Sequence, residues 1–320
     1  MRRRRRKIRK IWRNDGLYNF LRNYVDWATR RIYSRIYTEG RENIPTDGLI
    51  VYAPNHCCTM MDPMVLLQDD KRPLAFGARA DVFKKPSVAR IMYFLKILPL
   101  SRERDGMAAV TENLDVFNNA VKCMENGVPF CMFAEGRHRP ERGLQPLKKG
   151  VARIALQAAE TQEKPVYIVP VGLDYETFFD SMTGLTIRYG KAIRVEAEDN
   201  IRQIMQTLTE NLESLIGRPP VTVPRLGIVL KALLFPIFAI SFVLCWPILL
   251  ATAILSRKLK DRAWINTIRY GCLFVGVVLL TLIEGIPALV LLPWYISLPL
   301  IVALWYSHSI FHYILNIYKK

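Results

Sequence analysis

The sequence predicts a mixed α/β domain with a largely buried sheet flanked by helices. It also predicts an N-terminal interfacial amphipathic helix and a C-terminal hydrophobic helical membrane region. Between about residues 38 and 216, short apolar runs alternate with amphipathic segments, as strands and helices do along an α/β chain. Beyond residue 225 the side chains are mostly hydrocarbon. We therefore divide the chain into residues 1–37, 38–220 and 221–320.

The α/β part contains an ordered series of expected elements. Each expected strand is a short apolar run bounded by turn residues, and each expected helix has apolar residues at helical spacing. The expected strands are 49–53, 73–80, 128–136, 164–175, 185–190 and 192–196, and the expected helices are 62–68, 87–98, 107–127, 147–160 and 198–216. Asp62 is the expected N-cap of the first helix, because Pro63 suits the first helical position.

The N-terminal part is strongly basic and helix-like. It opens with "MRRRRRKIRKIWR", within a chain of net charge +17, so a polyanionic partner is expected. No apolar core of a secretory signal follows. The apolar residues instead recur at helical spacing: Leu17, Phe20, Leu21, Tyr24, Val25, Ala28, Ile32 and Ile36. This pattern predicts a helix in the interface of an anionic membrane, and a helix packed on its own domain is the alternative.

Two other partner classes are disfavoured by the sequence. Nucleic acid is not expected, because no zinc-finger, RNP-like or basic-zipper pattern accompanies the arginine run. None of the six cysteines forms a C-x-x-C pair and no second cluster supplies ligands, so neither a metal site nor a redox pair is expected. Cys57 and Cys58 are then small packing residues of a turn.

The C-terminal part contains two long apolar blocks. Residues 232–255 carry no charge and residues 270–306 carry only Glu284, whereas about 20 apolar residues suffice for one membrane span. The second block is too long for one straight helix and slightly short for two with a loop. Prolines at 236, 247, 287, 293 and 299 are expected to interrupt both blocks.

Basic residues flank both apolar blocks on every side. These residues are Arg225, Lys231, the segment "RKLKDR" at 257–262, Lys319 and Lys320. The positive-inside rule assigns all of these flanks to the cytoplasm. Each block is then expected to enter and leave on one face, as a helical hairpin or re-entrant pair; a single crossing by the first block is the alternative. We expect an integral protein of the cell membrane with its α/β domain on the cytoplasmic face.

The segment "APNHCCTMMDP" places His56 and Asp62 six positions apart, across an expected strand-to-helix turn. The turn can bring the two side chains together. A carboxylate that accepts Nδ1–H fixes the tautomer of a histidine and leaves Nε2 free as a general base. The chain contains no G-x-S-x-G elbow, so the hydroxyl that loses its proton is expected to belong to a substrate.

A basic cluster follows another expected strand. In "FAEGRHRPERGLQPLKKG", Glu135 and Gly136 stand at the strand end, before a set of cationic residues: Arg137, His138, Arg139, Arg142, Lys148 and Lys149. Arg102 follows a further apolar run in "LPLSR". Arginine at a loop suits the recognition of phosphate, and a carboxylate headgroup would also bind there.

Four blocks in this order resemble the glycerolipid acyltransferases, a family that includes bacterial 1-acylglycerol-3-phosphate acyltransferases. The matching residues are Asn55, His56 and Asp62 for the N-H-x-x-x-x-D block, Arg102 in "LPLSR", Phe133, Glu135 and Gly136 in "FAEGRHR", and Val169, Pro170 and Val171 for the apolar fourth block. Two departures are present. Five residues rather than four separate His56 from Asp62, and the third block reads Arg-His-Arg where the family has Thr-Arg-Ser.

The resemblance implies acyl transfer from acyl-CoA or acyl-carrier protein to the hydroxyl of a lysophospholipid, most simply 1-acylglycerol-3-phosphate. It implies His56 as the general base and Asp62 as its orienter, with no cofactor and no metal. The residues expected to bind substrate are Asn55, Arg102, Glu135, Gly136, Arg137, His138, Arg139 and Lys149. One alternative acceptor is a lyso amino-acid lipid of the glycine or ornithine type. A non-catalytic basic membrane-binding protein is the second alternative.

Overall fold

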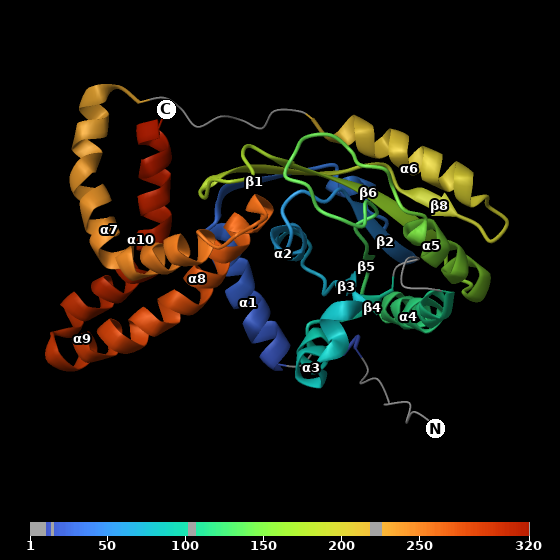
Figure 1. Ribbon diagram of the computed structural model, residues 1–320, viewed down its shortest axis with the longest axis horizontal. Coiled ribbons are helices and arrows are strands. Elements are labelled where there is room, and N and C mark those ends of the chain that lie inside the picture. The colour runs from blue at the N-terminus through green and yellow to red at the C-terminus, as the bar shows by residue number, and fades with distance from the viewer. Residues whose placement is uncertain (1–10, 14–15, 102–106, 218–225, 320) are drawn as a thin grey trace.

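The computed structural model describes residues 11–13, 16–101, 107–217 and 226–319, with backbone alone for 107–113. Four predictions lie outside the described residues: those for the basic run 1–10, Arg102, Arg225 and Lys320. Figure 1 shows the α/β domain on the right and the apolar helices on the left. The predicted class, a mixed α/β fold with long apolar C-terminal helices, is confirmed.

The central sheet has eight strands. They are β1 Tyr33–Glu39, β2 Leu49–Pro54, β3 Ala75–Arg79, β4 Ile97–Leu100, β5 Phe130–Cys131, β6 Val166–Tyr175, β7 Thr183–Tyr189 and β8 Ile193–Val195. Their order is β1-β7-β6-β2-β5-β3-β4, with β8 paired to β6. The pairs β6-β2, β2-β5, β5-β3 and β3-β4 are parallel, whereas β7 and β8 run antiparallel to β6. One edge of the sheet therefore collects the carboxyl ends of five parallel strands.

Helices cover both faces of the sheet (Figure 1). One face packs against α4 Met107–Glu125, α5 Gly150–Thr161 and α6 Ile201–Leu215, and the other against α1 Gly16–Arg30, α2 Met61–Asp69 and α8 Ile265–Leu280. Strand β2 shows why its sequence is apolar without alternation. Leu49, Val51 and Ala53 enter one core and Ile50 and Tyr52 the other, as expected for a strand that is buried on both sides.

The N-terminal helix is shorter than its apolar periodicity predicts. It ends at Arg30, and residues 33–39 form β1, which pairs with β7. The prediction that helical spacing continues to Ile36 is wrong, because pairing of this segment with β7 outweighs local periodicity. Strand β1 also crosses the boundary drawn after residue 37. Helix α1 packs on α2, while Leu17 and Phe20 near its start are 60% and 69% exposed.

Two boundaries in the α/β domain also differ from the sequence prediction. The helix expected at 87–98 ends earlier, as α3 Pro86–Phe94, and the next apolar residues form edge strand β4. Helix α2 begins at Met61, so Asp62 lies in its first turn and is not its N-cap. The Asp62 carboxylate instead accepts hydrogen bonds from the turn before the helix.

Among the described residues, three C-terminal segments are long and apolar enough to cross a membrane: Ile228–Ser256, Arg262–Leu291 and Trp294–Lys319. The first is α7; the second contains α8, a π-helical turn at Thr281–Gly285 and α9 Ile286–Leu291; the third is α10. The predicted interruption at every proline is wrong, because α7 continues through Pro236 and Pro247 and α10 through Pro299. Neighbouring helices can compensate for the lost backbone bonds in such regions.

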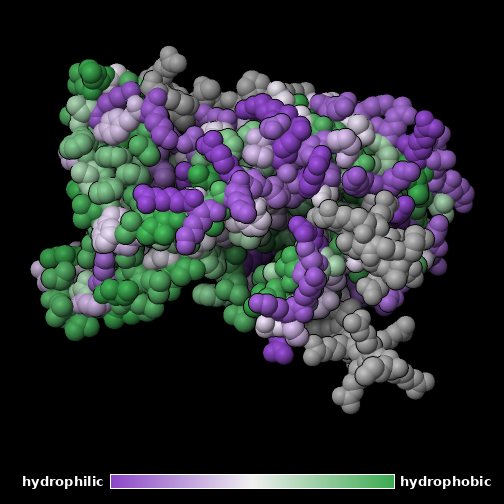
Figure 2. All heavy atoms as spheres, in the orientation of Figure 1, coloured by the Kyte–Doolittle hydropathy of each residue, from purple (hydrophilic) through white to green (hydrophobic). Residues whose placement is uncertain are grey.

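The apolar segments are joined to the α/β domain and are not a separate unit. Tyr270, Leu273 and Val277 of α8 belong to the same buried cluster as β2 and α2. Lys319 at the end of α10 makes an ion pair of 2.9 Å with Asp180 of the β6–β7 connection. Figure 2 shows hydrophobic residues gathered over α7–α10 and hydrophilic ones over most of the α/β domain.

Candidate active site

The sheet topology brings the first and third sequence blocks together. Strands β2 and β5 are neighbours and parallel, so their carboxyl ends lie at the same edge. His56 follows the end of β2, and Glu135 follows the end of β5. In α/β sheets, ligands commonly bind outside the carboxyl ends of the strands. The edge that holds His56 and Glu135 is therefore the candidate site.

Asn55 fixes the start of the turn that carries His56. Its side-chain amide donates to the Leu173 carbonyl (3.1 Å) and its Oδ1 accepts from the Leu173 backbone N–H (2.6 Å), which ties the turn to β6. Asn55 is only 2% exposed. In this structure its side chain orients the turn, whereas the sequence suggested that it binds substrate.

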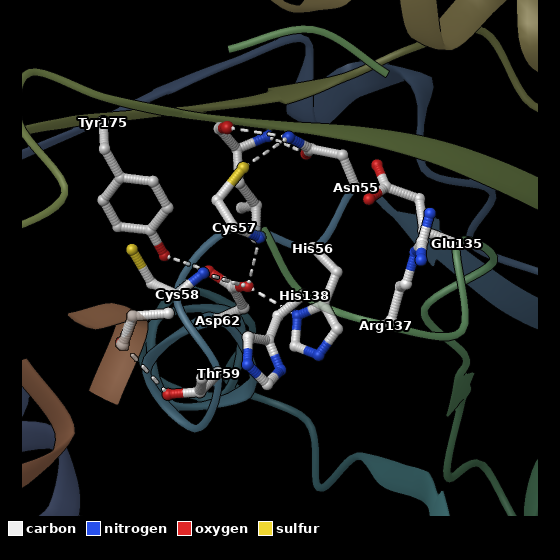
Figure 3. A network of polar contacts seen from close by, with 12 residues as sticks. Asn55, His56, Cys57, Cys58, Thr59, Asp62, Glu135, Arg137, His138 and Tyr175 are labelled. Atoms are coloured by element: carbon white, nitrogen blue, oxygen red, sulfur yellow. Dashed lines mark hydrogen bonds and ion pairs between the residues drawn. The ribbon is translucent and has the colours of Figure 1, made fainter. Parts of the chain in front are cut away.

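His56 and Asp62 form a close pair across the turn. The distance from His56 Nδ1 to Asp62 Oδ2 is 2.7 Å, and Asp62 is fully buried. Figure 3 shows the carboxylate between the His56 ring and Tyr175. With Nδ1 donating to the carboxylate, the neutral ring carries its lone pair on Nε2. This is the arrangement of a general base and its orienting carboxylate.

Three further donors hold the Asp62 carboxylate in place. The backbone N–H groups of Cys57 and Cys58 donate to Oδ2, each at 2.8 Å, and the Tyr175 hydroxyl donates to Oδ1 at 2.5 Å. Burial raises the pKa of Tyr175 well above its ordinary value, so its hydroxyl keeps the proton that it donates. A buried carboxylate without such donors would be costly. The pair is therefore rigidly positioned.

The His56 ring lies at the surface of the site. It stacks on Phe133 with a centroid distance of 4.3 Å, and its side chain is 16% exposed. Within the described part of the chain, no hydrogen bond to His56 Nε2 is found. A substrate hydroxyl can therefore approach this nitrogen from the open side of the ring.

The two cysteines of the turn are structural. Cys57 and Cys58 are buried, and burial raises the pKa of both thiols, which makes them poor nucleophiles at neutral pH. Their backbone N–H groups are already used by Asp62.

Glu135 and Arg137 are connected through a residue that sequence reasoning missed. Gln145 donates from Nε2 to Glu135 Oε2 (2.8 Å) and accepts at Oε1 from Arg137 Nε (3.1 Å). Glu135 is buried, and burial raises the pKa of its carboxyl group. Between them Gly136 has φ +69°, a left-handed conformation that favours glycine. Gln145 thus holds the Arg137 side chain against the buried Glu135.

The remaining predicted binding residues, His138, Arg139 and Lys149, differ in their distance from His56 and in their partners. His138 lies beside His56, with a ring-centroid distance of 5.6 Å, and its Nε2 is 2.8 Å from Asp261 Oδ2. Arg139 makes an exposed ion pair with Glu141. Lys149 is exposed at the start of α5, and among the described residues its side chain makes no hydrogen bond or ion pair with the other site residues.

Arg142, which the sequence also places in the basic cluster, is bound to the end of β6. Its guanidinium donates to Asp174 Oδ1 (3.0 Å) and to the Tyr175 carbonyl (3.1 Å), at the end of β6. Arg188 of β7 bonds the second oxygen of the same Asp174 carboxylate (3.1 Å). Arg142 therefore braces the loop.

Sequence reasoning missed Tyr175, Gln145 and Asp261 as members of this site. Tyr175 and Asp261 are 113 and 123 positions from their partners Asp62 and His138. Gln145 had a weak signal, since it lies within the basic segment as an uncharged polar residue. No local pattern marks the other two, because sheet pairing and helix docking place them.

The fold and the site together place a histidine–carboxylate pair at the carboxyl edge of an α/β sheet, an arrangement that suits general-base chemistry. Comparisons with known proteins agree. Residues 35–174 match the family model described as Acyltransferase, a range that contains all four sequence blocks. The match of residues 35–174 confirms the family resemblance expected from the sequence.

Matches outside the family model are distant. One matching structure is the crystal structure of the 1-acyl-sn-glycerophosphate (LPA) acyltransferase PlsC from Thermotoga maritima. The identity is 19%, the TM-score is 0.47, and the match covers 64% of this chain and 83% of that chain. No curated protein matches the sequence significantly. The residue roles above rest on this chain's own geometry.

Proposed function

We propose that this protein transfers a fatty acyl chain from a thioester donor, acyl-CoA or acyl-carrier protein, to the hydroxyl of a lysophospholipid. The preferred acceptor is 1-acylglycerol-3-phosphate, which would yield phosphatidate in phospholipid biosynthesis. The observation that carries this proposal is the His56–Asp62 pair, with Nε2 open beside a basic loop. Pure charge binding requires no such pair, which disfavours a non-catalytic membrane-binding protein.

The geometry supports a direct transfer in two steps. His56 Nε2 removes the proton of the acceptor hydroxyl while that oxygen attacks the thioester carbonyl, which forms a tetrahedral intermediate. Collapse of the intermediate breaks the carbon–sulfur bond, and the imidazolium returns its proton to the leaving thiolate. The products are an ester and a free thiol. The buried carboxylate of Asp62 stabilises the transient imidazolium at Nδ1.

The acceptor headgroup is assigned to the loop after β5. Arg137 is exposed, and its Nε donates to Gln145, so the remaining N–H donors of its guanidinium can bind a phosphate. His138 lies between this loop and His56. A phosphomonoester carries more charge than the carboxylate of an amino-acid lipid, so the basic loop favours lysophosphatidate. A lyso amino-acid lipid stays the second candidate acceptor.

We also propose that the protein is integral to the cell membrane, with the α/β domain on the cytoplasmic face. Three contacts support entry and exit of the apolar helices on one side. Asp261, before α8, meets His138; Lys319, at the end of α10, meets Asp180; and Tyr318 donates to the carbonyl of Lys231 in α7. Both ends of the second apolar block thus lie near the same domain, which favours a hairpin for that block. The first block is the single continuous helix α7, so the expected hairpin within it is not formed.

Membrane contact at the N-terminal helix is part of the same proposal. The exposed Leu17 and Phe20 at the start of α1 would enter the headgroup region, and the net charge of +17 would favour anionic lipids. An acidic acyl-carrier protein would be attracted by the same charge. Neither partner requires a cofactor or a metal.

The acceptor can be identified directly. Purified protein in phosphatidylglycerol-containing vesicles is given labelled acyl-CoA and, separately, lysophosphatidate or a lyso-ornithine lipid. Labelled phosphatidate from wild type and none from His56→Ala is the expected result. Labelling of the ornithine lipid alone would change the acceptor, and equal labelling by both proteins would refute the base assigned to His56.

The orientation has a separate test by thiol labelling in intact cells. Five of the six cysteines are buried and Cys272 is partly exposed, so a Cys272→Ala protein is a nearly silent background. Lys260→Cys in the loop before α8 and Ser214→Cys on exposed α6 should both resist an impermeant reagent until the cells are opened. Labelling of residue 260 alone from outside would make α7 a true crossing.

A further inference from the structure

The apolar C-terminal region touches the turn that carries the catalytic pair. Thr59, between His56 and Asp62, has φ +42°, a left-handed conformation for a residue with a branched side chain. Its hydroxyl lies 2.7 Å from the hydroxyl of Thr267 in α8, and both residues are buried. A membrane anchor alone would need no hydrogen bond to this turn.

A second contact comes from the loop between α7 and α8. Asp261 Oδ1 accepts from the Ala263 N–H (2.9 Å), and Oδ2 lies 2.8 Å from His138 Nε2. His138 is 26% exposed and sits edge-on to His56, with Trp264 against it at a centroid distance of 6.1 Å. The loop thus holds His138 next to the base.

The hydrogen bond between His138 and Asp261 determines which ring nitrogen of His138 can contact a substrate. The hydrogen bond from His138 lowers the pKa of Asp261, so this carboxylate is ionised at neutral pH. Because Nε2 is used by Asp261, His138 meets a ligand with Nδ1 only. A protonated His138 ring donates from both nitrogens, so its Nδ1–H can then donate to an anionic ligand beside His56. His138 belongs to the part of the third block where this chain has Arg-His-Arg.

We propose that Asp261 is a positioning residue, which holds His138 so that Nδ1 contacts the anionic headgroup of the acceptor. The C-terminal region is then part of the acceptor site as well as a membrane anchor. This inference rests on the proposed function, since it concerns the same site. It assigns to residues outside the matched family range a part in substrate recognition.

The test compares Asp261→Asn with Asp199→Asn. Asparagine at 261 can still accept from the Ala263 N–H, so the loop keeps its cap. Asp199 is also an exposed aspartate that accepts a backbone N–H, from Glu196, and it lies before α6, in a different part of the fold. We expect Asp261→Asn to raise KM for lysophosphatidate about tenfold, the order of one lost charge-assisted contact. KM for acyl-CoA and kcat should stay within about twofold, and Asp199→Asn should match wild type.

A double-mutant cycle separates positioning from a general structural effect. If Asp261 acts through His138, Asp261→Asn should add nothing to the KM of a His138→Ala protein. Additive effects, or an unchanged KM in Asp261→Asn, would overturn the proposal even if His56→Ala is inactive as proposed above.

A chemical readout does not depend on which lipid is the acceptor. Loss of the Asp261 partner should free Nε2, so diethyl pyrocarbonate should modify His138 faster in Asp261→Asn than in Asp199→Asn, as followed by peptide mass spectrometry. Equal rates would overturn the pairing in solution. Faster modification without turnover of lysophosphatidate would leave the pairing intact and refute only the proposed acceptor.

Discussion

The catalytic pair and the basic loop lie side by side but are held in different ways. Asp62 is fully buried and receives four hydrogen bonds, from His56, Cys57, Cys58 and Tyr175. The basic loop after β5 carries the exposed residues Arg137 and Arg139, and the Arg139 side chain makes a surface ion pair with Glu141. Surface pairs of this kind contribute about 0–1 kcal/mol.

The difference in burial between the pair and the loop matches the different tasks that we propose for them, proton transfer and headgroup recognition. A general base must be held in one tautomer and one orientation, which buried hydrogen bonds achieve. Headgroup recognition needs charge at the right place, and exposed side chains provide it while they stay adjustable. Changes at the pair should therefore affect kcat, and loss of the Asp62 side chain should also affect folding, whereas changes at the loop should affect KM for one substrate.

The largest effect is expected at the base itself. His56→Ala should lower kcat by about 10²–10⁴-fold, the usual contribution of a general base. Folding should be preserved, because Asp62 keeps its other three donors. Steady-state rates at saturating substrates and circular dichroism check both parts. Substantial turnover by a folded His56→Ala protein would contradict the mechanism.

Two substitutions at Asp62 should differ in stability. Asparagine can accept from the turn and donate to Tyr175, so Asp62→Asn should fold but lose most activity, because it no longer stabilises the imidazolium by charge. Asp62→Ala leaves buried donors of Cys57, Cys58 and Tyr175 unpaired and should cost about 3–5 kcal/mol. Thermal unfolding in detergent measures the contrast. Equal melting temperatures would mean that the donors find other partners.

A smaller effect, on one substrate only, is expected at the basic loop. Arg137→Ala should raise KM for lysophosphatidate about tenfold and leave KM for acyl-CoA unchanged, because Gln145 holds this guanidinium near the site. Arg139→Ala is the matched control, since Arg139 pairs with exposed Glu141, and it should change KM less than about twofold. Equal effects of the two arginines, or on both substrates, would show that the headgroup binds elsewhere.

The smallest expected effect concerns stability and pH at Glu135. Burial raises the pKa of the Glu135 carboxyl group in the folded protein. The protonated carboxyl group is therefore compatible with the fold at low pH, and this stability is lost as the pH rises through the folded pKa. Glu135→Gln should therefore raise the melting temperature relative to wild type at pH 8, and the gain should shrink toward pH 5. Exposed Glu163→Gln is the control and should show no such trend. A gain that is independent of pH would contradict burial of the charge as its cause.

The sequence by itself determined the class of fold, the family resemblance and the central pair of residues. Apolar runs that are buried on both faces reveal β2 and β6, and the spacing of His56 and Asp62 across a turn already indicates that the two side chains meet. These signals are local, because a strand, a turn and a helix start are each encoded within about ten residues. The 87–98 segment shows the limit, since an edge strand replaced the end of a helix that its periodicity favours.

Only the tertiary structure decided what surrounds that pair. Tyr175 reaches Asp62 because β6 pairs with β2, and Asp261 reaches His138 because α8 packs on the face of the sheet that α2 also covers. These partners are more than 100 positions apart in the chain. Their meeting depends on strand order and on the docking of an apolar helix, which are properties of the whole buried core. No short stretch of sequence carries that information.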